Sequence, residues 1–161
     1  MSKQKQILHA VNVVIAELSA HGFTIQRYDA WKTNSVYLKL DYGLGNSIRF
    51  SDHPGKKHLQ YMFNVLTNFT EGDPRAKSTT ARYYYGTEEK QLLRLVSHLV
   101  AHRDSRVITL GVDGYAKAYE EYREMGYQIK TGFWSQARVV HKGTLPKECI
   151  SIDINKGVLD W

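Results

Sequence analysis

Cationic side chains and tyrosines are concentrated in one window of the chain, between residues 37 and 85. Lysine and arginine neutralise phosphates, and tyrosine rings carried on strands stack on bases, so this combination is typical of nucleic-acid binding. In the alternative interpretation, every second tyrosine belongs to the core and the charges only keep the surface soluble. The side chains concerned are Arg49, Lys56, Lys57, Arg75, Lys77 and Arg82, with Tyr37, Tyr61, Tyr83, Tyr84 and Tyr85.

One shorter pattern in this window could add catalysis. Asp52 and His53 are an adjacent carboxylate and imidazole, as in a general base with its orienting group, and His58 lies in the same connection. Neighbouring residues at a strand end point apart, however, and Asp-His-Pro-Gly is an ordinary turn. We therefore predict a turn without catalytic residues. The residues predicted to contact a partner or nucleic acid are Arg49, Asp52, His53, Lys56, Lys57, His58, Arg75, Lys77, Arg82 and Tyr84.

Histidine spacing raises the question of a metal site. His98 and His102 are at i, i+4, which places both on one face of a helix and could hold a divalent ion. The run HLVAH has no glutamate at the position that metalloproteases use. The single cysteine, Cys149, forms no internal disulfide and has no second thiol for a zinc cluster. We predict no metal and no cofactor.

Length and charge limit the class of protein. The chain has 161 residues, with 22 lysines and arginines against 16 aspartates and glutamates, a formal net charge of +6. This excess permits contact with nucleic acid or a nucleoprotein and does not require it. The N-terminal apolar segment contains Asn12, Glu17 and Ser19 and no cleavage signal, so we expect neither signal peptide nor membrane span, and a cytoplasmic protein. A single domain over 1–161 is expected, with 68–80 as its only plausible sub-boundary.

The predicted contact residues are carried mainly by strands and their connections. Period-two alternation over 36–42, 48–51 and 59–65, separated by turn residues, predicts a three-stranded antiparallel meander. Further strands are expected at 23–25, 82–85, 107–110, 127–129, 139–140 and 150–154.

Helices are expected to cover this sheet. Apolar residues at helical spacing predict three helices, capped by Ser2, Thr87 and Asp113, with Gly22 and Gly126 at the ends of the first and third. The strand between the second and third helices would make that part a βαβ-type crossover. The predicted fold class is α+β, a mixed and mainly antiparallel sheet with three helices packed on it.

The meander and the leucine-rich helix after it resemble the central part of phage-encoded type II anti-CRISPR proteins. In that family a strand of the form Ile-Arg-apolar-Ser-(Asn or Asp)-His precedes another strand and a long helix. The likeness covers residues 23–102, and its motif is formed by Ile48, Arg49, Phe50, Ser51, Asp52 and His53.

This resemblance implies a small phage or mobile-element protein in the host cytoplasm that inhibits a bacterial defence nuclease. It would bind the RNA-guided DNA nuclease of the host, or another nucleoprotein, with direct contact to nucleic acid as a further expectation and no membrane partner. The relatives begin with an arginine-rich arm, whereas this chain begins with a predicted helix, so no activity of the arm carries over. Trp161 is predicted either to dock on its own chain or to form a homodimer contact.

A second likeness covers residues 85–129. The run VITLGV and the helix ending in AYEEYREMGY are similar to the second half of the acyl-CoA-dependent N-acetyltransferases, in which a tyrosine at the position of Tyr122 can act as an acid. The pyrophosphate loop of that family is reduced here to Gly86, and Glu88 and Glu89 would repel the cofactor's phosphates. The alternative function is therefore an acetyltransferase-like protein, with or without activity. Between the two, we expect a binding protein rather than an enzyme.

Overall fold

The computed structural model describes residues 3–30, 35–50, 59–66, 78–85, 88–128 and 133–147, with 59–66 and 78–85 described as backbone. Helices and strands are both present, which confirms the α+β class. The elements in chain order are α1 (Lys3–Ala20), β1 (Ile25–Ala30), β2 (Ser35–Leu40), η1 (Asp41–Gly43), β3 (Ser47–Phe50), β4 (Leu59–Leu66), β5 (Ser78–Tyr85), α2 (Glu89–Gln128), η2 (Phe133–Gln136) and β6 (Arg138–His141).

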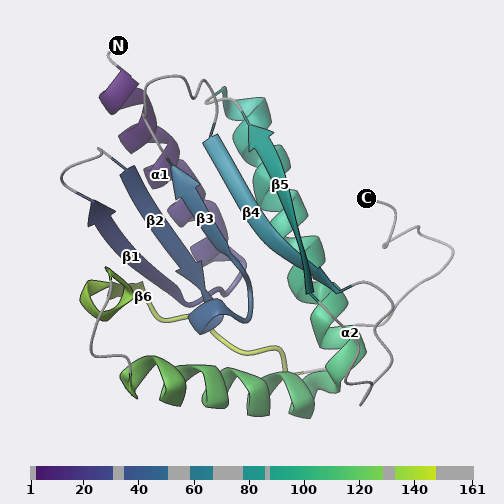
Figure 1. Ribbon diagram of the computed structural model, residues 1–161. Coiled ribbons are helices and arrows are strands. Elements are labelled where there is room, and N and C mark those ends of the chain that lie inside the picture. The colour runs from purple at the N-terminus through teal and green to yellow at the C-terminus, as the bar shows by residue number, and fades with distance from the viewer. Residues whose placement is uncertain are drawn as a thin grey trace, which may run out of the picture.

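The strands form one six-stranded sheet in the order β5-β4-β3-β2-β1-β6 (Figure 1). Every pairing between the described strands is antiparallel. The consecutive pairing of β2, β3 and β4 confirms the predicted meander, which arises because each strand alternates apolar and polar residues. β5 begins at Ser78, inside the segment 68–80 that was predicted as a loop.

α1 and the first half of α2 lie on one face of this sheet (Figure 1). Alternate residues of β2 and β3, Leu38 and Ile48 among them, are buried against apolar stripes of α1 and the first half of α2. We call this the covered face. The opposite face, which we call the open face, is covered by no helix of the described part of the chain. The covered-face core contains Ile7, Ala10, Val11, Val14, Leu18, Phe23, Ile25, Val36, Leu38, Leu40, Ile48, Phe50, Leu92, Leu95, Val96 and Leu99.

The end of α1 follows the prediction from sequence. Gly22 has a φ of +83°, in the left-handed region that glycine adopts without penalty. The N–H of Gly22 donates to the carbonyl of Ser19, and the N–H of Phe23 donates to the carbonyl of Leu18. This pair of bonds is the Schellman arrangement, and it turns the chain from α1 directly into β1.

The prediction of three helices is wrong, because the expected strand over 107–110 is helical and lies inside α2. Val107 is buried and continues the helical stripe of Leu95 and Leu99, so a short apolar run that fits either structure belongs to the helix. The helix breaks at Gly111, where φ is +79° and ψ is 162°, values that are not helical. The expected βαβ-type crossover is therefore absent from the described residues.

The end predicted for the last helix is also wrong. α2 passes through Gly126 and ends at Gln128, so Tyr127 is helical and does not begin a strand. An isolated glycine near an exposed helix end costs too little to stop the helix. The expected strand over 139–140 is confirmed as part of β6.

The break at Gly111 turns α2 through a sharp bend. The first half runs along the covered face, and the second half, which we call the arm (residues 112–128), crosses beneath the ends of the strands (Figure 1). A second apolar cluster joins the arm to the turn after β2, with Leu44 packed among Val107, Tyr115 and Tyr119.

Several predictions concern residues outside the described part of the chain. These are the caps at Ser2 and Thr87, the strand over 150–154, Cys149 and Trp161. Within the described ranges, neither α1 nor α2 has the combination of length and apolar character that crossing a bilayer requires.

Candidate functional site

The open face is built by the residues that alternate with the buried ones. In β2, Val36, Leu38 and Leu40 point into the core, so Tyr37 and Lys39 point to the opposite side. Cross-strand partners share a face. The register therefore assigns to the open face, besides Tyr37 and Lys39, the side chains of Gln26, Tyr28, Ser47 and Arg49.

Two rings and a cation form one continuous row across this face. Tyr28 pairs with Tyr37, and Tyr37 pairs with Arg49, in three neighbouring strands. The ring centroids of Tyr28 and Tyr37 are 6.2 Å apart with an interplanar angle of 43°. The guanidinium carbon of Arg49 lies 5.6 Å from the ring centroid of Tyr37, within the range of a cation–π contact. We call these three residues the aromatic–cationic row.

The backbone register extends this row to the outer strands. Arg49 pairs with Gln60, and Gln60 pairs with Tyr84, so the row reaches position 84 of β5. In the adjacent row, Lys39 pairs with Ser47, which leads through Met62 to position 82 of β5. Arg49, Arg82 and Tyr84, three of the predicted contact residues, thus occupy positions in these two rows.

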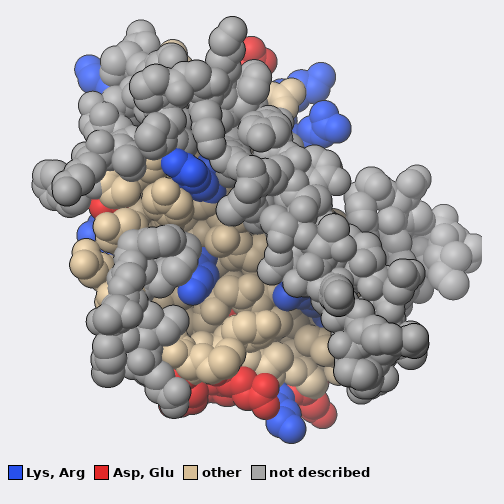
Figure 2. Space-filling model, in the orientation of Figure 1, with Lys and Arg blue, Asp and Glu red and all other residues tan. Residues whose placement is uncertain are grey.

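The electrostatics of the open face favour an anion. No aspartate or glutamate occupies an open-face position in the described strands β1, β2 and β3. Burial lowers the pKa of Lys39, which fits its placement within the face rather than at its margin. Figure 2 shows lysine and arginine within the surface over the sheet, and aspartate and glutamate, with some lysine or arginine among them, at the lower edge.

Arg49 has a donor that the described residues do not use. Its Nε atom is buried and has no hydrogen-bond acceptor among them, and the amide oxygen Oε1 of Gln26 is buried and has no hydrogen-bond donor among them. Buried polar atoms are almost always bonded, so such atoms on one face are candidates for ligand contact. Both atoms belong to open-face residues.

The other predicted contact residues lie outside the described part of the chain: Asp52, His53, Lys56, Lys57, His58, Arg75 and Lys77. Sequence reasoning missed Tyr28, Lys39 and Gln26. The run IQRYDA of β1 is polar on both faces and partly buried along most of its length, so its period does not separate them. The signal that could have found Tyr28 is its register opposite Tyr37.

A second polar cluster is buried and is centred on Asp41, the residue after β2. Asp41 is fully buried, and its Oδ1 accepts the backbone N–H of Thr24 at 2.9 Å. Its Oδ2 accepts Nε of Arg103 at 2.9 Å and the hydroxyl of Tyr115 at 2.5 Å. Burial, and then the negative charge of Asp41, raise the pKa of Tyr115, so its hydroxyl stays a donor.

Arg103 ties four segments of the chain to this carboxylate. Beyond Asp41, its guanidinium donates to the backbone carbonyls of His21, Gly22 and Thr144 at 3.1–3.2 Å. It also lies over the ring of Phe23, 4.7 Å from the centroid. Every acceptor in this set belongs to the protein itself, so the cluster is a structural junction and not a binding site.

Close packing at this junction depends on a glycine. The N–H of Gly143 donates to Oγ1 of Thr24, which also bonds the hydroxyl of Tyr119. A Cβ at position 143 would lie 2.0 Å from the carbonyl oxygen of Gly22. The loop after β6 can therefore cross the α1–β1 joint only where it has no side chain.

The predicted histidine pair, His98 and His102, lies on the first half of α2. Burial is the main reason that the pKa of His98 is lowered and the pKa of His102 is lowered to about 4, and nearby arginines lower both further. Within the described residues, no three histidine, cysteine or acidic side chains are grouped so as to hold a metal ion.

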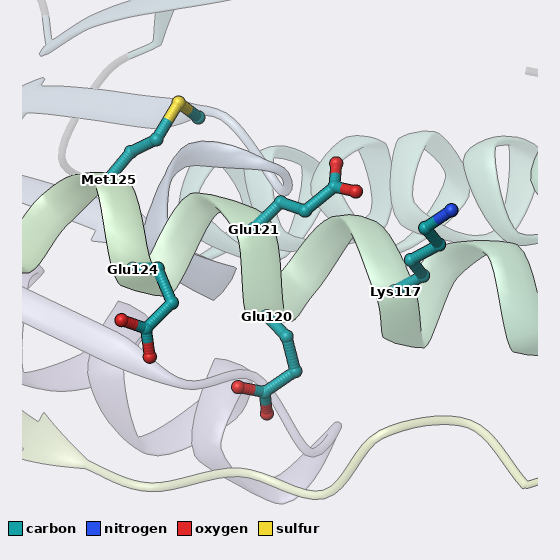
Figure 3. A pocket seen from close by; sticks show the side chains of 5 residues that line it. All are labelled: Lys117, Glu120, Glu121, Glu124 and Met125. Carbon is teal, nitrogen blue, oxygen red and sulfur yellow. The ribbon is translucent and has the colours of Figure 1, made fainter.

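The arm borders an open hollow of about 770 Å³ on the acidic side of the molecule. Figure 3 shows its described lining, all of it from α2 and three of its members glutamates. Glu120 and Glu124 both pair with Arg123, which places these charges in ordinary surface ion pairs. The lining residues are Lys117, Glu120, Glu121, Glu124 and Met125.

The open face is thus the part of the described structure with the chemistry of a binding site. Its rings can stack planar groups, and its cations can bind anions. The chain matches no protein-family model, and comparison with curated proteins and with solved structures gives no match.

Proposed function

We propose that this chain is a binding protein without catalytic activity and that its open face contacts the nucleic acid of a nucleoprotein. The aromatic–cationic row of Tyr28, Tyr37 and Arg49 carries this proposal. Stacking on tyrosine and charge neutralisation by arginine and lysine are the two interactions that sequence-tolerant nucleic-acid binding requires. The lack of acidic residues on the described open face supports the same partner.

We further propose that the nucleoprotein is an RNA-guided DNA nuclease of the host, and that binding inhibits it. The support is the resemblance of residues 48–53 to the strand motif of type II anti-CRISPR proteins. Arg49 belongs both to that motif and to the aromatic–cationic row. The protein would then originate from a phage or another mobile element.

The acetyltransferase-like alternative is not proposed, because no observation on the described residues favours it. The run VITLGV, which that likeness needs as a strand, is helical up to the break at Gly111. Tyr122 is exposed on the arm, and the position of Gly86 lies outside the described residues.

A cleavage assay with two matched variants tests the proposal. The type II effector–guide complex is given target DNA alone, with the wild-type chain, with Arg49→Gln and with Arg27→Gln. Arg27 lies in the same sheet but pairs with Leu38, on the covered face, and forms an ion pair with Asp29 at 2.9 Å. Both variants remove one positive charge, so a difference between them reports position and not net charge.

We expect the wild-type chain and Arg27→Gln to slow cleavage and Arg49→Gln to lose most of that effect. Equal cleavage rates with and without the wild-type chain would overturn the proposed partner. Equal inhibition by the two variants would show that the open face does not make the contact.

A further inference from the structure

We infer that the open face takes single-stranded rather than double-stranded nucleic acid, with the strand running along the aromatic–cationic row. This inference rests on the proposed contact with nucleic acid and specifies its form. It follows from the spacing of the rings and from the direction of the row.

The first argument is the distance between the rings. The centroids of Tyr28 and Tyr37 are 6.2 Å apart, whereas successive bases of a duplex are separated by about 3.4 Å along the helix. Two neighbouring bases can each contact one ring only after they have separated from each other. A paired and stacked duplex presents its backbone and base edges and no base faces, so it cannot use these rings.

The second argument is the direction of the row. Tyr28, Tyr37 and Arg49 follow one another perpendicular to the strands, and the register continues to position 84 of β5. Four strand spacings of about 4.8 Å give a track of roughly 19 Å, enough for a few extended nucleotides. A strand laid along it would place bases over the rings at one end and phosphates near the cations beside them.

The third argument is the placement of polar atoms beside the rings. Lys39 occupies the row next to Tyr37, and it pairs in register with Gln26. Among the described residues, Nε of Arg49 lacks an acceptor and Oε1 of Gln26 lacks a donor. The face also carries the cations Lys39 and Arg49 next to two rings, a combination that suits the phosphates and unpaired bases of a single strand.

Fluorescence anisotropy with labelled oligonucleotides of about ten nucleotides, within the usual site size of sheet-based single-strand binders, tests the inference. The full chain is titrated with a mixed-sequence single strand and with the same strand annealed to its complement. The variants are Tyr37→Leu, Tyr37→Phe and, as the matched control, Tyr122→Leu on the arm, where the side chain is 37% exposed. Circular dichroism confirms that each variant is folded.

We expect the single strand to bind at least about tenfold more tightly than the duplex, because only its bases can stack. Tyr37→Leu should weaken single-strand binding about tenfold or more, whereas Tyr37→Phe, which keeps the ring, and Tyr122→Leu should stay near wild type. Arg49→Gln should reduce the slope of log K against log salt concentration by roughly 0.7, the value for one phosphate contact on a single strand.

Duplex binding equal to or tighter than single-strand binding would overturn the inference, and so would an unchanged affinity of Tyr37→Leu. Its failure can be separated from failure of the proposed function. Inhibition of cleavage without selective single-strand binding leaves the nuclease as partner and removes the single-strand site. Selective single-strand binding without inhibition of cleavage keeps the single-strand site and removes the nuclease as partner.

Discussion

Two arginines of this protein each lie against tyrosine, and their surroundings are opposite. Arg103 is 7% exposed and donates to one carboxylate and three backbone carbonyls. Arg49 lies over Tyr37 on the open face, and its Nε has no acceptor among the described residues. The first makes four hydrogen bonds within the fold, whereas Nε of the second makes none to the described residues.

The comparison separates stability from binding. An arginine that donates to a buried carboxylate and to backbone carbonyls of several segments holds those segments together, and its removal leaves buried acceptors and a buried charge without partners. An arginine with an unused donor on a face without acidic residues contributes little to folding and is available to a ligand. Substitutions of Arg103 and Arg49 test that division, and substitutions of Gly111 and His102 test the features of α2 next to the junction.

Arg103→Met should lower the free energy of unfolding by about 3–5 kcal/mol, because the carboxylate of Asp41 stays buried without its cation. Arg94→Met, an exposed arginine on the same helix, should change it by less than about 0.5 kcal/mol. Chemical denaturation of both variants measures the difference. A loss below about 1 kcal/mol for Arg103→Met would contradict its role as the junction.

Gly111→Ala should destabilise the protein by about 1–3 kcal/mol, because a φ of +79° with a ψ of 162° is accessible almost only to glycine. Nothing lies within 4 Å of a Cβ at this position, so the cost is backbone strain and not a clash. Gly126→Ala, also in open space but in helical backbone, should instead stabilise by roughly 0.5–1 kcal/mol. Opposite signs in thermal melts would confirm that the bend is built in, and equal signs would refute it.

Protonation of His102, on α2, should make the stability of the protein depend on pH. Its pKa is lowered from 6.5 to about 4, first by burial and then by the positive charges of His98 and Arg106. Since the folded state disfavours protonation, stability is complete above about pH 6.5 and falls as the pH drops toward 4. His102→Gln should reduce the loss of unfolding free energy at acid pH by roughly 1–2 kcal/mol, allowing for the partial exposure of the ring. The substitution should change the free energy of unfolding little at pH 8. Denaturation at pH 8 and pH 5 measures both values; an unchanged acid loss would contradict the assignment.

Arg49→Gln should change the free energy of unfolding by less than about 0.5 kcal/mol while it weakens nucleic-acid binding. The substitution removes its cation–π contact with Tyr37, a contact on the surface of the sheet that contributes little to stability. Stability from denaturation and affinity from anisotropy, measured on one preparation, decide the matter. A destabilisation of the size expected for Arg103→Met would end the distinction between the two arginines.

The parts of the fold that sequence predicted are those in which a single period dominates. In β2, β3 and β4, apolar and polar residues alternate because successive side chains of a strand point to opposite faces of the sheet. The antiparallel pairing of the three strands follows from this pattern. The run over 107–110 has four residues without a decisive period, and helix and strand are equally compatible with it. Val107 continues the buried stripe of Leu95 and Leu99 and belongs to the cluster of Leu44, and these tertiary contacts favour the helix.

The candidate site was predictable in part for the same reason. Arg49 and Tyr37 lie on strongly alternating strands, so their shared face can be derived from spacing. Tyr28 lies on a strand without clear alternation, and its role appears only through register. The pairing of Asp41 with Arg103 spans 62 residues and depends on a turn with positive φ at Asp41 and Tyr42. No local sequence pattern predicts this turn or this pairing.

The hydrogen bonds to Asp41 from residues on both sides of Gly111 affect how the molecule approaches a charged target. Arg103 precedes the break and Tyr115 follows it, yet both bond the same carboxylate oxygen, so a triangle of side chains fixes the angle of the arm. The glutamates of the arm are thereby kept at one margin, away from the cations over the sheet (Figure 2). The cations over the sheet and the glutamates of the arm therefore lie in different parts of the described structure, and the field of a polyanion favours the orientation in which the tyrosine-bearing side faces it before contact.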